Sequence, residues 1–350
     1  MIGLLVAVTI GFGLAFAAMP PVIAALRRHD VGQFIQEDVS EHSHKRGTPT
    51  MGGTVIIVAT ILGYLAAHLR IWSPEAGFGL DPRPFSAEAG LAILAFIGMG
   101  VIGFIDDYLK YARKHNQGLS KRWKFGGQLL VAGFFAWGAV AADVSTELSF
   151  TREVGIDLGW IYPLWVLFLL TAAANAVNLT DGLDGLAAGS SALVFGAFVI
   201  IGFWQFRNPD VYAVDGALDI GILAAALLGS VMAFLWFNAA PAELFMGDVG
   251  SQALGGAMAA LALLTNTHLL LAILGGLYVM EATSVILQVV SFRMFGKRIF
   301  RMAPIHHHFE LRGWPETTVI IRFWIIAGIS VALGLGIFYG DFISMEGGLS

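Results

Sequence analysis

The sequence predicts an all-α, polytopic integral membrane protein that forms a single domain over residues 1–350. Of its 350 residues, 57% are hydrophobic and only 13% are charged, whereas a soluble domain carries about 25% charged residues. The apolar residues gather in long runs, and a helix needs about 20 mostly apolar residues to span a bilayer. These observations predict about ten transmembrane helices. Cys is absent, which excludes disulfides and thiolate metal sites.

Ten apolar runs are candidate spans. No basic region precedes the first, so we interpret it as a membrane helix rather than a cleaved signal. Only Thr265–Thr267 separate the eighth from the ninth, which predicts a tight turn. The candidates are residues 2–25, 51–69, 89–105, 125–142, 160–177, 186–204, 219–237, 251–264, 268–291 and 320–340.

The placement of Lys and Arg predicts the orientation, because cytoplasmic loops are enriched in them. The net charge of −5 says little, since the charges are unevenly placed. Sixteen of the 20 basic residues lie in segments 27–46, 110–124 and 293–322. Those segments are predicted to be cytoplasmic and both termini external, which agrees with an even number of helices.

Two smaller elements are predicted outside the spans. In residues 143–160, apolar residues alternate on both sides of Thr151–Glu153, which is typical of a small β-hairpin on the external surface. Over residues 292–303, apolar residues recur at helical spacing with basic residues between them. This pattern predicts an amphipathic helix in the cytoplasmic interface; a charge cluster that merely ends a span is the alternative. Its apolar members are Phe292, Phe295, Ile299 and Met302.

Two acidic motifs lie where helices are predicted to meet the cytoplasmic interface. Asp106 and Asp107 end the third span, where the helix dipole disfavours negative charge, so we expect Mg²⁺, Lys110 or both to compensate them. Asp248 lies among glycines and precedes an apolar helix. Its alternatives are a metal ligand and a simple N-cap.

A third acidic motif lies at mid-chain, from Asn175 to Gly185. It carries Asn175, Asn178, Asp181 and Asp184 at the end of an apolar run. A single cap would satisfy the next helix. Four such side chains therefore indicate a polar site for a sugar, a base or a cation.

Two further segments suit a phosphorylated ligand. Lys45 lies in a basic loop where Gly52–Gly53 would let the backbone approach a ligand closely. Three consecutive residues share no face, so His306, His307 and His308 are poor zinc ligands but suitable donors to phosphate or sugar. Glu281 lies deep in the ninth span, where it either lines the site or pins two helices together.

The motifs and their positions favour some classes of function over others. No Walker A or GxGxxG motif is present, which disfavours NTPase and dinucleotide-binding functions. A secondary transporter would keep its carboxylates near the bilayer midplane, whereas here all the motif carboxylates except Glu281 gather at one face. An enzyme working at the interface is favoured over a transporter, and a scaffold protein is the weakest alternative.

The motifs, in this order, resemble those of the phospho-N-acetylmuramoyl-pentapeptide-transferase family. The wider superfamily of polyprenyl-phosphate N-acetylhexosamine-1-phosphate transferases shares the Asp motifs, while the histidine run indicates the muramoyl-pentapeptide family. A GlcNAc-1-phosphate transferase is the alternative within enzymes. The matching segments are SHKRGTPTMGG, GFIDDYLK, NAVNLTDGLDGLA, NAAPAELFMGDVGS and PIHHHFE, between residues 43 and 310.

The resemblance implies a bacterial enzyme of peptidoglycan synthesis in the cytoplasmic membrane, with its active site on the cytoplasmic side. Its substrates would be UDP-MurNAc-pentapeptide and undecaprenyl phosphate, and its products lipid I and UMP. It would use Mg²⁺, form a homodimer, contact membrane lipid and have no nucleic-acid partner. A phosphate monoester has a second pKa of about 6, so the lipid phosphate needs little deprotonation. Direct attack is favoured, with a covalent aspartyl-phosphate route as the alternative.

The resemblance also implies roles for single residues. Asp106, Asp107, Asp248 and His306 would be catalytic, with Asp248 the Mg²⁺ ligand. Asn175, Asn178, Asp181 and Asp184 would line the nucleoside-sugar pocket. Lys45 and Phe245 would hold the uracil, with Phe245 stacking on it. Thr50 and Lys110 would contact substrate, and His307 and His308 would lie with His306 by the diphosphate.

Overall fold

A computed structural model describes residues 1–29, 31–32, 47–73, 77–113 and 117–346. The predicted class, an all-α polytopic membrane protein, is confirmed: in the described part, eight helices are long and apolar enough to cross a membrane. They are α1 (Ile2–Arg28), α3 (Ala87–Arg113), α4 (Lys121–Ala141), α5 (Tyr162–Thr180, preceded by a 3-10 turn at Gly159–Ile161), α6 (Leu186–Arg207), α8 (Ala217–Asn238), α11 (Gly276–Phe295) and α13 (Glu316–Glu346).

Two shorter helices occupy the remaining predicted spans. α2 (Gly53–His68) has 16 residues, and α9 (Gly247–Leu264) has 18. The ninth predicted span is interrupted at Gly275, which separates the short α10 (Leu270–Leu274) from α11. Two other short helices, α7 (Pro209–Tyr212) and α12 (Ile305–Glu310), lie outside the spans.

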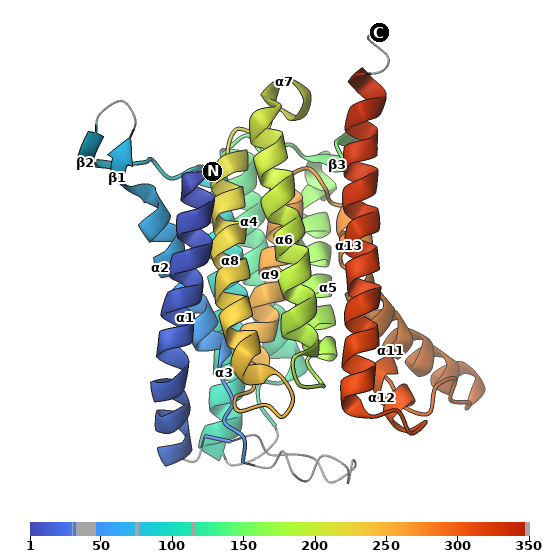
Figure 1. The fold of residues 1–350 in the computed structure, drawn as a ribbon. Coiled ribbons are helices and arrows are strands. Elements are labelled where there is room, and N and C mark those ends of the chain that lie inside the picture. Colours follow the sequence, from blue (N-terminus) through green and yellow to red (C-terminus); the bar gives the residue numbers. More distant parts are fainter. Residues whose placement is uncertain (30, 33–46, 74–76, 114–116, 347–350) are drawn as a thin grey trace.

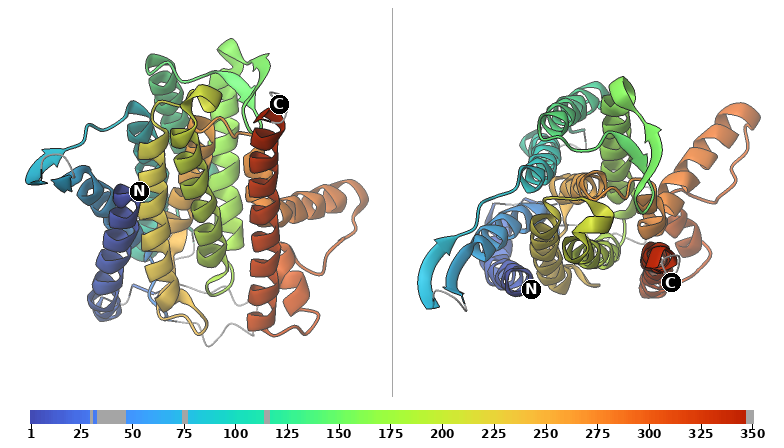
Figure 2. Two further views of the ribbon diagram at one scale, coloured as in Figure 1. Left: turned by 45° about the horizontal axis from the view of Figure 1, so that its top comes forward. Right: turned by 90° about the horizontal axis from the view of Figure 1, so that it is seen from above.

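α9 runs through the interior of the bundle, where it packs against α3 and α5 (Figure 2). Every residue from Val249 to Leu264 is buried. This segment is rich in Gly and Ala, and small residues let membrane helices approach each other closely. The start of α9, and the acidic residue in its first turn, are therefore held inside the bundle rather than at its rim.

Two antiparallel hairpins join the helices. The predicted hairpin is confirmed as β3 (Glu147–Ser149) and β4 (Glu153–Asp157). A second hairpin, β1 (Leu69–Ser73) with β2 (Gly77–Pro82), was not predicted. It begins directly after α2, and its first residue, Leu69, falls within the predicted span 51–69.

The predicted amphipathic helix over residues 292–303 is wrong. α11 ends at Phe295, and Gly296 follows with a φ of 64°. The side-chain oxygen of Gln288 then accepts hydrogen bonds from the backbone N–H groups of Ile299 and Phe300, both at 3.0 Å. These donors are held by a side chain of α11, so the segment folds back along that helix without forming one of its own.

The two ends of the bundle differ in what they carry. The start of α1, the end of α13 and the β3–β4 hairpin lie towards one end, which we call the terminal end (Figure 1). The start of α9, the loop between α5 and α6, and α12 lie at the other, which we call the motif end. The segments that carried the sequence motifs are thus brought together at one end of the bundle.

Candidate active site

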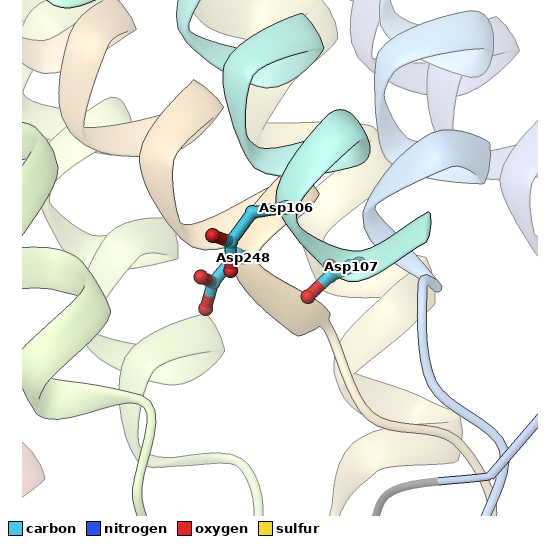
Figure 3. A group of neighbouring side chains, drawn as sticks. All are labelled: Asp106, Asp107 and Asp248. Carbon is cyan, nitrogen blue, oxygen red and sulfur yellow. The ribbon is translucent and has the colours of Figure 1, made fainter. Parts of the chain in front are cut away.

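Three carboxylates from two helices meet at the motif end. Asp106 and Asp107 project from α3, and Asp248 projects from the first turn of α9 (Figure 3). One carboxylate oxygen of each lies within 4.8 Å of the others. Because α9 begins at Gly247, Asp248 is not the N-cap, and the capping alternative for this residue is wrong.

Two lysines bridge the carboxylates. Nζ of Lys110 lies 2.7 Å from Oδ2 of Asp106, 3.4 Å from Oδ1 of Asp107 and 3.1 Å from Oδ2 of Asp248. Nζ of Lys124, on α4, lies 2.8 Å from Oδ2 of Asp248 and 3.6 Å from Oδ2 of Asp106. The expectation that Lys110 compensates the Asp pair is confirmed, and three carboxylates still outnumber two ammonium groups.

Neutral donors fix the orientation of each carboxylate. The backbone N–H of Leu119 donates to Oδ1 of Asp106 at 2.7 Å, and that of Val249 donates to Oδ2 of Asp107 at 3.1 Å. Nδ2 of Asn178, on α5, donates to Oδ1 of Asp248 at 2.8 Å. The predicted Asn178 therefore lies in the site, directly beside Asp248.

Glycines permit the close approach of the backbones around this cluster. A Cβ added at Gly103 of α3 would lie 2.1 Å from the backbone oxygen of Asp248, and one added at Gly247 would lie 2.5 Å from Oδ2 of Asp107. Gly247 also has a φ of 74°, in the region that favours glycine. A side chain at either position would separate α3 from α9 where their carboxylates meet.

The segment that contains Pro49 and Gly52 pairs with the segment that contains Phe245 through backbone hydrogen bonds. The N–H of Phe245 donates to the oxygen of Pro49 at 2.8 Å, and the N–H of Gly52 donates to the oxygen of Phe245 at 2.9 Å. Thr50 is half-buried between these bonds, and the Phe245 ring is half-buried beside them. Lys45 lies outside the described residues.

Asp184 closes the loop between α5 and α6. Its buried carboxylate accepts a hydrogen bond from the N–H of Ala242 at 2.9 Å, and its own N–H donates to Glu316 at 3.1 Å. Asp184 thus ties the loop to two neighbouring segments at the motif end.

Asp181 lies at the end of α5, in an acidic environment. Burial raises the pKa of Asp181 well above its ordinary value, and the negative charges of Asp248, Asp107 and Asp184 raise it further. Asp181 is therefore close enough to the carboxylate cluster to be affected by its charge.

Asn175 is not brought to the carboxylates. Its side chain is exposed on α5, and Nδ2 donates to the backbone oxygen of Thr171 in the same helix at 2.7 Å. Asn178, three residues later, is the amide that faces α9.

The three histidines of α12 have three different partners. Nδ1 of His306 lies 3.1 Å from Oε2 of Glu281, and both side chains are fully buried. Nδ1 of His307 lies 2.7 Å from Oε2 of Glu310. Glu281 of α11 therefore contacts α12, which supports the alternative that it pins two helices together.

His308 accepts a hydrogen bond from the N–H of Arg301 at Nδ1, at 3.0 Å. Removal from water lowers its pKa, and the positive charges of Arg312 and Arg301 lower it further. His308 therefore braces the segment before α12.

Two features of the site were missed from the sequence. Lys124 was counted only among the basic residues that set the orientation, yet its ammonium group contacts Asp248. The Glu281–His306 pair joins residues 25 positions apart, and no local pattern relates them. Lys124 directly precedes the predicted span 125–142 and follows two other basic residues, Lys121 and Arg122, so the sequence did not single it out.

The fold and this site define a membrane-embedded sugar-phosphate transferase, and comparison with known proteins agrees. Residues 90–266, about half of the chain, match the model of glycosyl transferase family 4. Residues 45–57 match signature 1 of phospho-N-acetylmuramoyl-pentapeptide-transferase.

Curated relatives give the narrower assignment. The chain is 49% identical to the phospho-N-acetylmuramoyl-pentapeptide-transferase of Frankia alni, over 99% of this chain and 100% of the relative. It is 46% identical to that of Thermobifida fusca, over 97% and 98%, and 46% identical to that of Streptomyces griseus, over 98% and 99%. The chain belongs to the phospho-N-acetylmuramoyl-pentapeptide-transferase family.

Proposed function

We propose that this protein transfers phospho-MurNAc-pentapeptide from UDP-MurNAc-pentapeptide to undecaprenyl phosphate, giving lipid I and UMP in peptidoglycan synthesis. The observation that carries the proposal is the cluster of Asp106, Asp107 and Asp248 with two lysines at the motif end. Such a cluster suits a reaction between two phosphorylated substrates, because it offers both ammonium donors and carboxylate ligands.

Mg²⁺ is the proposed cofactor. The three carboxylates offer oxygen ligands, the type that Mg²⁺ prefers. The Lys110 ammonium lies within 3.4 Å of all three carboxylates, which supports a position for positive charge between them. Asp248, with Asp106 or Asp107, would hold the ion. When bound, it would neutralise charge on the diphosphate.

The chain's own groups would then orient the two substrates. The side chains of Lys110 and Lys124 are 31% and 23% exposed to solvent. Their ammonium groups can therefore turn from the carboxylates to substrate phosphates. Asp107 would position the lipid phosphate or take its residual proton. We propose direct attack of that phosphate on the sugar-proximal phosphorus, with UMP as the leaving group.

The remaining site residues form the proposed nucleotide-sugar pocket. The half-buried ring of Phe245 would stack on uracil beside Lys45 and Thr50. The acidic loop after α5 would face the sugar, and the histidines of α12 would lie by the diphosphate. The proposed pocket residues are Asn178, Asp181, Asp184, His306, His307 and His308.

The test uses purified protein, Mg²⁺, undecaprenyl phosphate and a panel of UDP-sugars, with UMP release as the readout. We expect turnover of UDP-MurNAc-pentapeptide and little of UDP-GlcNAc. Equal or better turnover of UDP-GlcNAc would instead support a GlcNAc-1-phosphate transferase. Omission of Mg²⁺, with EDTA present, should abolish UMP release.

The proposed location is the bacterial cytoplasmic membrane, with the motif end in the cytoplasm, supported by the bias of basic residues. Ser149 is a poor labelling position because it is buried and its backbone oxygen binds the N–H of Leu269. Cys placed at the exposed Glu153 should react with an impermeant thiol reagent in intact cells, and Cys at Lys297 should not. The opposite pattern would reverse the orientation.

We also propose a homodimer, testable by mass measurement in nanodiscs.

A further inference from the structure

α11 carries a polar stripe that the transfer reaction does not by itself explain. Tyr278, Glu281, Ser284 and Gln288 are spaced by three, three and four residues, so they share one face of the helix. The first three are buried. Polar side chains within a membrane helix are costly and generally face partners or a functional site, so each member of the stripe requires a partner.

Tyr278 fixes the first part of α11 to the bundle. Its hydroxyl lies 2.9 Å from Oγ of Ser190 and 2.8 Å from Oγ of Ser191, both on α6. This contact anchors the helix without touching the histidine segment.

Gln288 holds the segment that leads into α12. Its side-chain oxygen accepts from two N–H groups, as described above, and its Nε2 donates to the oxygen of Phe300 at 3.0 Å. Three hydrogen bonds from one side chain fix the return of the chain along α11. The position of α12 therefore depends on α11.

Glu281 completes this arrangement at His306. Both side chains are fully buried, and Nδ1 of His306 lies 3.1 Å from Oε2 of Glu281. A buried carboxylate is tolerated where an opposite charge or a donor faces it. The contact uses one edge of the imidazole ring and leaves the other edge to point elsewhere.

That other edge faces the acidic loop between α5 and α6. A Cβ added at Gly182 would lie 2.5 Å from Nε2 of His306, and the loop carries Asp181 on one side and Asp184 on the other. Within the described residues, the buried Nε2 has no hydrogen-bond partner. Nδ1 and both oxygens of Glu281 also lack a hydrogen bond, so the 3.1 Å contact between the two side chains is an ion-pair contact. An imidazole nitrogen held in this way points toward a ligand bound at the loop.

We propose that Glu281 is a positioning residue that acts through His306, by holding the imidazole so that Nε2 faces a sugar diphosphate at the loop of residues 181–185. This inference rests on the proposed transfer reaction. Glu281 does not touch substrate; it orients the group that does.

The test is a double-mutant cycle with Glu281→Gln, His306→Gln and the combined variant, in the full-length protein. Gln keeps the shape of Glu and removes its charge. We expect each single variant to lower kcat/KM for UMP release about 10- to 100-fold, the usual effect of losing such a supporting contact. The combined variant should be no worse than His306→Gln alone, and its pH–rate profile should superimpose on that of His306→Gln.

The matched control is Tyr278→Phe, which removes a buried hydroxyl one turn away on the same helix. It should change thermal stability but leave kcat/KM close to that of the unchanged protein. A loss in the combined variant equal to the product of the two single losses would overturn the proposal, because a purely structural Glu281 acts independently of His306. An unchanged kcat/KM in Glu281→Gln would overturn it as well.

Failure of the proposed function would be visible separately, in the unchanged protein. If another UDP-sugar is the substrate, the same cycle run on that sugar still tests the positioning role. The same double-mutant cycle can be measured without turnover, from the calorimetric affinity of the UDP-sugar for the unchanged protein, the two single variants and the combined variant. A protein that neither binds nor turns over any UDP-sugar would contradict both proposals.

Discussion

In the described part of the chain, two largely buried clusters around aspartates, one near each end of the bundle, are built on opposite principles. At the terminal end, Oδ1 of Asp219 on α8 lies 2.7 Å from Nε2 of His68, and Oδ2 accepts hydrogen bonds from the hydroxyl of Tyr64 at 3.0 Å and the N–H of Ser86 at 2.8 Å. At the motif end, three carboxylates share two lysines. One carboxylate with several donors stabilises a fold, whereas crowded carboxylates weaken it.

The difference indicates which cluster serves binding. The terminal cluster joins α2, α8 and the segment before α3, and its single carboxylate faces one imidazole and two neutral donors. The carboxylates of the motif cluster repel one another, and this repulsion is relieved when a cation binds between them. A phosphorylated ligand can then bind the two lysines. Functional sites commonly sacrifice stability in this way. Substitutions at the two ends should therefore separate activity from stability.

The largest expected effect is at Asp248. Asp248→Asn keeps shape and removes charge, while both lysines retain Asp106 as a partner. We expect turnover to fall about 10³-fold, in the upper range for loss of one electrostatic group in an active site, with the melting temperature maintained. UMP release at saturating Mg²⁺ and thermal unfolding measure the two quantities. Near-normal turnover with an unchanged Mg²⁺ requirement would contradict the ligand assignment.

Asp219→Asn should show the opposite behaviour. Removing this charge leaves His68 buried beside a neutral amide, and breaking a buried pair costs about 3 kcal/mol. We expect a lower melting temperature and unchanged turnover per folded molecule. Asp215→Asn is the control, because Asp215 precedes the same helix and is exposed; it should change neither quantity. A large loss of turnover in folded Asp219→Asn protein would end the contrast between the two clusters.

The sequence predicted the motif end better than the terminal end, for a physical reason. Acidic residues beside apolar spans stand out against their surroundings, so Asp106, Asp107 and Asp248 were found without a structure. His68 and Asp219 lie 151 positions apart, and each alone looks like an ordinary end of a span. Only the packing of α2 against α8 brings them together.

Sequence periodicity also gave a wrong prediction where a side chain from an earlier helix determines the backbone conformation. Residues 292–303 have helical periodicity, yet Gln288 captures the N–H groups of Ile299 and Phe300. Lys124 had no signal that separated it from neighbouring basic residues, because its role depends on where α4 meets α9. Hydropathy located the spans well, since the length of an apolar run is a property of the sequence alone.

Phe245 offers a smaller, graded test of the motif end. Its backbone bonds to Pro49 and Gly52 do not depend on the ring, so Phe245→Ala should keep the fold. If the ring stacks on uracil, binding should weaken by roughly 1–3 kcal/mol, the range for base–aromatic stacking, and Phe245→Trp should retain most of it. Calorimetry with UDP-MurNAc-pentapeptide measures the change. A lower melting temperature with unchanged affinity would assign the ring to packing.

The smallest expected effect concerns Asp181, where substitution should increase stability rather than decrease it. Burial and the neighbouring carboxylates raise its pKa in the folded protein, whereas in the unfolded chain the pKa is about 3.9. A carboxyl whose pKa is raised by folding binds its proton more tightly when folded, so stability decreases as the pH rises above the unfolded value. At neutral pH this carboxyl group therefore lowers the free energy of unfolding.

Asp181→Asn removes that penalty and should raise the melting temperature at pH 8, while turnover falls because the pocket loses a carboxylate. The stability gain should fade as the pH falls below about 4, where Asp181 is mostly protonated in both the folded and the unfolded state and resembles Asn. Thermal unfolding of both proteins across this range gives the difference directly, and Asp215→Asn again serves as the control. A melting temperature that drops at pH 8, as expected for Asp219→Asn, would place Asp181 with the stabilising carboxylates and contradict the distinction between the two ends.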